Sequence, residues 1–159
     1  MMLQKIKAFV KLDVKTKLMF LEAFLFLGWG RIMKLLPFSK IAPTLGLPME
    51  ETNRDYNEQE KRVLASVSQS IHIMSKYTLW ESQCLVKAIA GMKMLERRGI
   101  ESTIYLGTAK DERGLLIAHA WLRSGPFYIS GAEEMERFTV VSKFAKRISA
   151  RQIKGEHYG

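Results

Sequence analysis

The sequence contains little cysteine and little histidine. Cys84 is its one cysteine, and its three histidines, His72, His119 and His157, lie far apart in the chain. A single thiol cannot form a disulfide within the chain, so no disulfide framework holds the fold. These four residues are too few and too scattered for a typical zinc site, and no other metal or cofactor is indicated. Cys84 is therefore either a small buried residue or a reactive thiol, and a reducing cytoplasm suits both.

Long hydrophobic runs are also missing. The apolar stretch from Leu18 to Phe38 is interrupted by Glu22, Arg31 and Lys34. Its longest uncharged part is far short of the ~20 residues that a membrane span needs, and no signal-peptide cleavage site follows it. We expect an apolar amphipathic helix that packs on the domain or on a partner. Peripheral contact with a membrane surface is the alternative, because five lysines precede the stretch: Lys5, Lys7, Lys11, Lys15 and Lys17.

Acidic residues are few relative to basic ones. The chain has 16 Asp and Glu against 25 Lys and Arg, a net charge of +9. The basic residues are spread along the chain, and no run of them alternates with aromatic residues, so the pattern does not favour nucleic-acid binding. An acidic protein or an anionic membrane would also match this charge. A length of 159 residues, with 47% hydrophobic and 26% charged, suits one globular domain.

The N-terminal region, residues 1–56, is predicted to be helical and then irregular. A helical pattern runs from Lys5 to Leu36, and Gly28 and Gly30 weaken its middle, so it reads as one helix or two. Residues 39–56 contain two prolines and a glycine, which predict a surface loop. We expect this region to form one folding unit with the remainder of the chain.

Residues 57–159 are predicted to form the core, of α+β class, with a helix packed on an antiparallel β-meander. Asn57 is a favourable N-cap for the first core helix, because Glu60 follows three residues later. Apolar residues at helical spacing give this helix one buried side: Val63, Val67, Ile71 and Met74.

Cys84 is predicted to lie near the start of the next helix, which ends with Gly99 as its C-terminal cap. Ser82 as N-cap would place the thiol in the first turn, whereas a capping box of Thr78 and Glu81 would place it in the second. Both alternatives stay open. A helix N-terminus favours a thiolate and offers backbone N–H groups to an oxyanion.

Three short strands are predicted beyond this helix, at Thr103–Gly107, Leu115–Arg123 and Phe127–Ser130. His119 lies within the second strand and shares a face with Trp121. A histidine inside an apolar strand is costly unless it has a partner. A cysteine at a helix start, followed by a meander with a histidine in its second strand, is a layout in which thiol and imidazole can meet. Cys84 and His119 are therefore the predicted catalytic pair.

Four segments carry a family resemblance as a set: Cys84–Ala88, Leu95–Ile100, Leu106–Gly107 and Ala118–Leu122. Together they resemble the leader peptidase of lasso-peptide biosynthesis, a family of the transglutaminase-like superfamily. The segment Leu36–Phe38 also resembles the region before that family's catalytic domain. The resemblance implies a papain- or transglutaminase-like fold and a cysteine protease that removes the leader from a ribosomally made lasso-peptide precursor.

The resemblance also implies an aspartate that orients the imidazole from the following strand, but the matching position is Gly131. Glu133 is the predicted third catalytic member, and a Cys–His dyad is the alternative. Gln83 is expected to help stabilise the oxyanion, and Trp121 to contact the substrate. Further candidates near the third position are Glu134, Ser130 and Tyr128.

The chain resembles the stand-alone protease half of a split system. The resemblance implies three partners: the precursor peptide, a small leader-binding protein and a macrolactam-forming cyclase. Two other classes remain as alternatives, namely another transglutaminase-like thiol acyl transferase and a non-catalytic basic adaptor for a membrane or protein. An apolar surface is predicted in the N-terminal region as a docking face, formed by Phe20, Phe24, Phe26, Trp29 and Met33.

Overall fold

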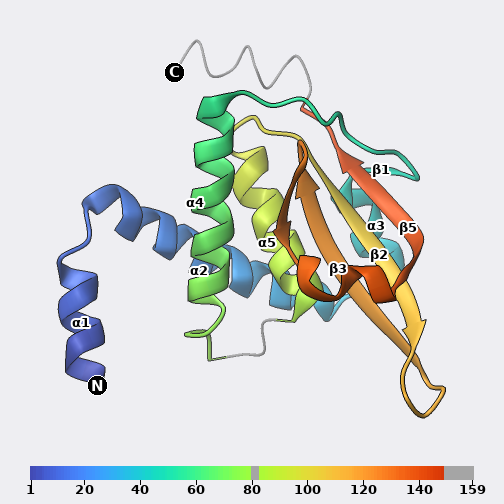
Figure 1. Cartoon of the computed structure of the whole chain (residues 1–159), viewed down its shortest axis with the longest axis horizontal. Coiled ribbons are helices and arrows are strands. Elements are labelled where there is room, and N and C mark those ends of the chain that lie inside the picture. Colours follow the sequence, from blue (N-terminus) through green and yellow to red (C-terminus); the bar gives the residue numbers. More distant parts are fainter. Residues whose placement is uncertain (80–82, 149–159) are drawn as a thin grey trace.

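The computed structural model describes residues 1–79 and 83–148, which form a helical layer and a five-stranded antiparallel sheet (Figure 1). The α+β class predicted from the sequence is confirmed. The helices are α1 (Met2–Val10), α2 (Val14–Lys34), α3 (Phe38–Leu45), α4 (Glu58–Met74), α5 (Cys84–Glu96) and the 3-10 helix η1 (Ala132–Arg137). The strands are β1 (Leu47–Pro48), β2 (Ser102–Lys110), β3 (Leu116–Ser124), β4 (Phe127–Ser130) and β5 (Thr139–Lys146).

The N-terminal helical stretch is divided, but not at its glycines. Asp13 caps α2, and its carboxylate accepts a hydrogen bond from the Thr16 N–H, so the break lies between residues 10 and 14. Gly28 and Gly30 lie inside α2. A Cβ on Gly30 would lie 3.0 Å from the Val86 carbonyl oxygen, so this glycine allows α2 and α5 to pack closely. Gly30, expected to weaken the helix, instead lies at the contact between α2 and α5.

The predicted loop over residues 39–56 was partly wrong, because it begins with α3. Ile41 and Leu45, one helical turn apart, are both buried and hold α3 on the core. Pro43 lies within the helix on its exposed side, where the carbonyl left without a donor can bind water. The next residues form β1, which pairs with β5.

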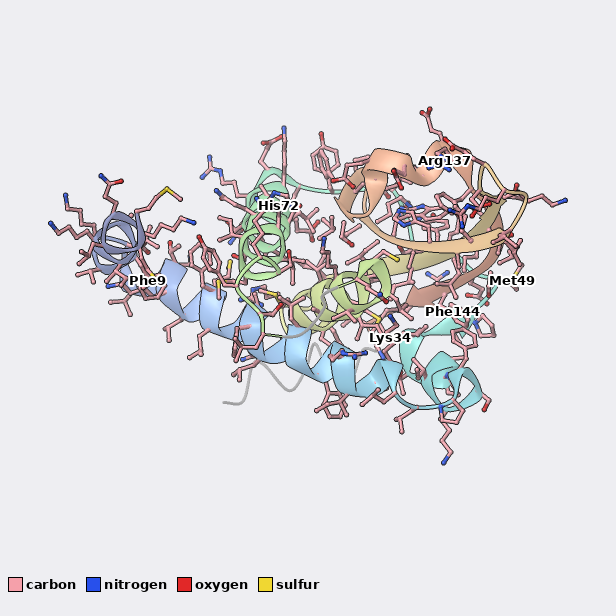
Figure 2. The ribbon with its side chains drawn as sticks, turned by 90° about the horizontal axis from the view of Figure 1, so that it is seen from below. Phe9, Lys34, Met49, His72, Arg137 and Phe144 are labelled. Carbon is pink, nitrogen blue, oxygen red and sulfur yellow. The ribbon has the colours of Figure 1, made fainter. Side chains whose placement is uncertain are left out.

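The two core helices begin close to where the sequence indicated. The Asn57 side chain caps α4 by accepting from the Glu60 N–H at 2.8 Å, as predicted. Gly99 has φ +67°, consistent with the predicted turn after α5. The predicted single apolar face of α5 was too narrow, because α5 packs against α2 and α4 on one side and the sheet on the other (Figure 2). Its neighbours therefore bury most of the circumference of α5.

The sheet contains the predicted meander and one strand more. Its order is β1-β5-β2-β3-β4, and all neighbours are antiparallel. The additional strand in the meander's sheet is β5, which was not among the three strands predicted from the sequence. Strand β5 pairs with β2 and β1, so β3 and β4 form the other end of the strand order. Helix α4 packs against β4, and α5 packs against β2, β3 and β4. In the β2–β3 register, His119 lies opposite Gly107.

A buried polar network fixes β3 against the chain before α4. Arg123 is fully buried, and its guanidinium donates to the Tyr105 hydroxyl at 2.8 Å and to the carbonyls of Thr52 and Gly125 at 3.0 and 2.7 Å. The Tyr105 hydroxyl donates to Glu51 at 2.6 Å. Burial, and then this hydrogen bond, raise the pKa of Tyr105, so the phenol keeps its proton and remains a donor. The network holds the Tyr105 ring in one place beside the centre of β3.

Candidate active site

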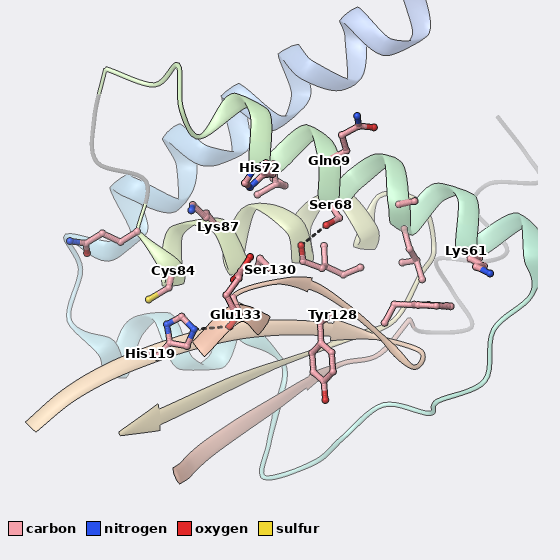
Figure 3. A pocket seen from close by; sticks show the side chains of 17 residues that line it. Lys61, Ser68, Gln69, His72, Cys84, Lys87, His119, Tyr128, Ser130 and Glu133 are labelled. Atoms are coloured by element: carbon pink, nitrogen blue, oxygen red, sulfur yellow. Dashed lines mark hydrogen bonds between the residues drawn. The ribbon is translucent and has the colours of Figure 1, made fainter. Parts of the chain in front are cut away.

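One groove with a volume of about 690 Å³ is lined by both Cys84 and His119. Helix α4, the start of α5, and strands β3 and β4 with the turn after them form its walls. Figure 3 shows the Cys84 side chain at the start of α5, next to the His119 ring in the groove that both line. The structure therefore brings together the two residues that the sequence paired across 35 positions.

Cys84 is the first residue of α5, and Gln83 is the N-cap. Of the two caps considered from the sequence, Ser82 and the Glu81 of the capping box lie outside the described residues. The first backbone hydrogen bond of the helix runs from the Lys87 N–H to the Gln83 carbonyl. The Cys84 N–H precedes this ladder, so it has no carbonyl partner within the helix and can bind an oxyanion beside the thiol. Gln83 also lines the groove, as its predicted role requires.

The His119 ring is held by a backbone carbonyl. Its Nε2 lies 2.7 Å from the Gly131 oxygen, which can only accept a hydrogen bond (Figure 3). This contact requires a proton on Nε2, and the neutral imidazole then carries its lone pair on Nδ1. An imidazole in this tautomer can take a proton from the thiol at Nδ1. The Gly131 carbonyl thus orients the imidazole, as a carboxylate does in a catalytic triad.

Aromatic rings fix the plane of the imidazole. His119 packs against Phe138 at 4.9 Å and Trp121 at 5.8 Å between ring centroids, and Trp121 stacks on Tyr105 at 5.6 Å. Trp121 was predicted to contact substrate, but it is only 4% exposed and does not line the groove. Its contacts are those of a residue that positions the imidazole. The sequence analysis gave no role to Phe138, an apolar residue directly before β5.

An aspartate does not fit at position 131. Gly131 has φ +77°, and a Cβ there would lie 2.4 Å from the Ala120 carbonyl oxygen and 2.9 Å from the Trp121 Cβ. The missing side chain is therefore required by the packing of the turn against β3. Glu133, the predicted third member, lines the groove near His119 (Figure 3), but among the described hydrogen bonds the imidazole nitrogen is bonded to the Gly131 carbonyl.

The remainder of the groove has both apolar and polar lining, and it carries more positive than negative side chains. Lys61 and Lys87 line it together with one carboxylate, that of Glu133. The Ser130 hydroxyl is buried without a hydrogen-bond partner, and such a group favours a polar ligand or water nearby. The groove can accept an extended peptide whose carbonyl groups and carboxylates meet these donors. The sequence placed Ser130 and Tyr128 near the site, and both line the groove.

Replacing Gly131 by alanine is expected to lower the free energy of unfolding by roughly 2–5 kcal/mol, because the left-handed backbone and the close Ala120 oxygen both oppose a Cβ. Activity should fall as well, since the carbonyl that holds His119 must move. Chemical unfolding and a peptide-cleavage assay measure the two effects.

Gly114 provides the matched control. It has nearly the same backbone, with φ +78°, but no atom lies within 4 Å of where its Cβ would be. The Gly114→Ala variant should therefore lose only the ~1–2 kcal/mol of the left-handed conformation and keep full activity. Equal losses of stability in the two variants would show that the contact with Ala120 has no effect.

Within residues 1–79 and 83–148, no group of three or more His, Cys, Asp or Glu side chains is arranged to bind a metal ion. A family model described as the transglutaminase-like superfamily matches residues 27–143, from the middle of α2 to β5. This range includes the whole groove. No curated protein and no solved structure gave a significant match.

Proposed function

Because this chain belongs to the transglutaminase-like superfamily, a superfamily of cysteine peptidases and acyl transferases, we propose that it is a cysteine peptidase that cuts the leader from a ribosomally made lasso-peptide precursor. The observation that carries the peptidase assignment is Cys84 at the first position of α5, facing an imidazole held by the Gly131 carbonyl in one groove. The four sequence segments around this pair support the leader-peptidase assignment.

The reaction proceeds through an acyl-enzyme. The His119 Nδ1 takes the thiol proton, and the Cys84 sulfur attacks the carbonyl carbon at the leader–core junction. The Cys84 N–H, with the Gln83 side chain, stabilises the oxyanion. The imidazolium then gives its proton to the leaving amine, which releases the core peptide. Water, deprotonated by His119, attacks the thioester and releases the leader with a new carboxylate.

The groove supports a peptide substrate better than a small one. It runs along α4, and its two lysines lie apart, with Lys87 near Cys84 and Lys61 at the other end of the groove (Figure 3). The precursor peptide would lie along this groove. A small leader-binding protein would deliver it, and a macrolactam-forming cyclase would take the released core. A leader held by such a partner bound to this protein would act as a tether, and a short tether often raises the local concentration of the scissile bond to millimolar.

The test is cleavage of a precursor peptide encoded beside this chain, with and without the neighbouring leader-binding protein, followed by mass spectrometry. We expect leader and core with a free carboxylate at the cut, and much faster cleavage when the partner is present below substrate saturation. A leader with a scrambled partner-binding segment is the control and should lose the acceleration.

The outcomes separate the alternatives. With a primary amine added, an amide at the new C-terminus would identify an acyl transferase instead of a peptidase. Equal rates with and without the partner would remove the delivery role while leaving the catalytic pair. Absence of cleavage of any such precursor with the partner present would contradict the leader-peptidase assignment.

A further inference from the structure

The outward face of α2 is a stripe of large apolar side chains that no described part of the chain covers. Every exposed residue of α2 except Lys15 belongs to it, with side chains between 46% and 70% exposed. The members of this α2 stripe are Val14, Leu18, Leu21, Leu25, Trp29 and Ile32. Of the docking face expected from the sequence, Trp29 belongs to the stripe, whereas Met33 is buried in the core.

The stripe runs the whole length of the helix. Its members are three or four residues apart, which keeps them on one side over about 30 Å. The opposite side of α2 is also apolar, and there Ala23, Leu27 and Met33 pack into the core. A helix that is apolar on both sides requires a second apolar surface in addition to its own domain.

The charges around the stripe are mostly positive. Residues 1–40 carry two acidic side chains against eight basic ones: Asp13 caps α2, and Glu22 is bound by Arg97 and Arg98 at 3.0 and 2.6 Å. The segment therefore keeps a large excess of positive charge from its basic side chains. These are Lys5, Lys7, Lys11, Lys15, Lys17, Arg31, Lys34 and Lys40.

Helix α1 continues the same chemistry. None of its residues is buried, and it projects from the body of the molecule (Figure 1). Met2, Leu3, Ile6, Phe9 and Val10 are all exposed. Of these, Met2, Ile6 and Phe9 line a hollow that α1 forms with α2 and α4, where the Lys5 ammonium lies 5.6 Å from the centre of the Tyr77 ring. Exposed apolar side chains on a short basic helix match a surface that is apolar inside and anionic outside.

We propose that the α2 stripe lies on the surface of an anionic lipid bilayer, in the plane of the interface, with the basic N-terminal segment beside it. The contact proposed is with the bilayer surface, since no helix among the described residues is long and apolar enough to cross a bilayer. A second copy of the chain is disfavoured, because its identical face would set lysines against lysines. Trp29 within the stripe is the residue type that favours the interface. The inference does not depend on the proposed peptidase activity.

The arrangement leaves the groove accessible. Figure 2 shows α2 along one side of the molecule and the sheet on the other, with α5 between them. The groove is lined by α4, the start of α5, β3 and β4, and none of its lining residues comes from α1 or α2. A protein bound to a bilayer through the α2 stripe could therefore still admit a peptide to Cys84.

Vesicle flotation of the full chain tests the proposal. We expect binding to vesicles of phosphatidylcholine mixed with phosphatidylglycerol, little binding to phosphatidylcholine alone, and weaker binding at high salt. The triple variant Leu21→Gln, Leu25→Gln, Ile32→Gln should bind at least about tenfold more weakly. The triple variant Lys5→Gln, Lys7→Gln, Lys11→Gln should lose roughly 100-fold, because each lysine near an anionic surface contributes roughly a factor of five.

The matched control is Leu116→Gln with Val141→Gln, which removes equally exposed apolar side chains from β3 and β5 and should leave vesicle binding unchanged. Brominated lipids should quench the fluorescence of the parent chain, and Trp29→Phe should abolish most of that quenching. Unchanged binding by the stripe variant would overturn the proposal. A parent chain that does not bind anionic vesicles would also overturn it. If that chain is a dimer that the stripe variant dissociates, the stripe is a dimer interface, and if it is a monomer, the stripe binds another protein.

Discussion

Replacing Cys84 by alanine is expected to abolish peptide cleavage, lowering kcat by roughly a million-fold to the uncatalysed background. The substitution removes the sulfur that shares the groove with His119, and no other thiol exists in the chain to replace it. The fold should survive, because Cys84 is small and half-buried and alanine is the best helix former. The free energy of unfolding should change by no more than about 1 kcal/mol. Mass spectrometry of the precursor digest and thermal unfolding check both parts.

A chemical control uses the same single thiol. Iodoacetamide should add one carbamidomethyl group, inactivate the protein in proportion to that modification, and react more slowly when precursor peptide occupies the groove. The Cys84→Ser variant keeps the shape but provides a much weaker nucleophile, so it should be nearly as inactive as Cys84→Ala. A folded Cys84→Ala protein that still processes its precursor would rule out the mechanism.

Replacing His119 by alanine is expected to lower the cleavage rate by roughly 10²–10⁴-fold, the usual contribution of a positioned general base. The Nδ1 that takes the thiol proton disappears, and the leaving amine loses its proton donor. Stability will also change, because the ring packs between Phe138 and Trp121. His119→Gln is therefore the better second variant, since its amide can still donate to the Gly131 carbonyl but cannot act as a base.

His72 is the matched control for this loss. It lines the same groove on α4, so His72→Ala removes an imidazole from the same surface without touching the proton relay. We expect it to change turnover by less than tenfold. Glu133→Gln should also have a small effect, because the Gly131 carbonyl already holds Nε2. A loss in Glu133→Gln equal to that in Cys84→Ala would make Glu133 the third catalytic member, and a folded His119→Gln with normal turnover would remove His119 from the mechanism.

Local signals predicted the parts of the fold that determine the site. The Asn57 cap and the glycine after α5 mark helix ends within a few residues, and the strand–turn alternation marks the meander. Because these elements follow one another with short connections, their order already indicated that Cys84 and His119 would meet. Helix α3 was missed because Pro43 argued against it, and the buried Ile41 and Leu45 outweighed that local preference.

The rest of the site depends on atoms that sequence patterns do not describe. The group that orients His119 is a main-chain oxygen, which every residue possesses, so no residue type at position 131 signals it. Its placement depends on a turn packed against Ala120 and on the rings of Trp121 and Phe138.

Because the group that holds His119 is the main-chain carbonyl of Gly131, side-chain substitutions and pH changes affect it differently from a carboxylate. Alanine scanning replaces side chains, and at Gly131 an added Cβ also strains the turn, so such a survey of the groove cannot isolate the carbonyl that holds His119. The carbonyl also has no proton to gain or lose, so acid cannot switch it off as it would protonate an aspartate. Chemical synthesis offers the direct probe. An ester in place of the amide between residues 131 and 132 would weaken that one acceptor while every side chain of the groove stayed as it is.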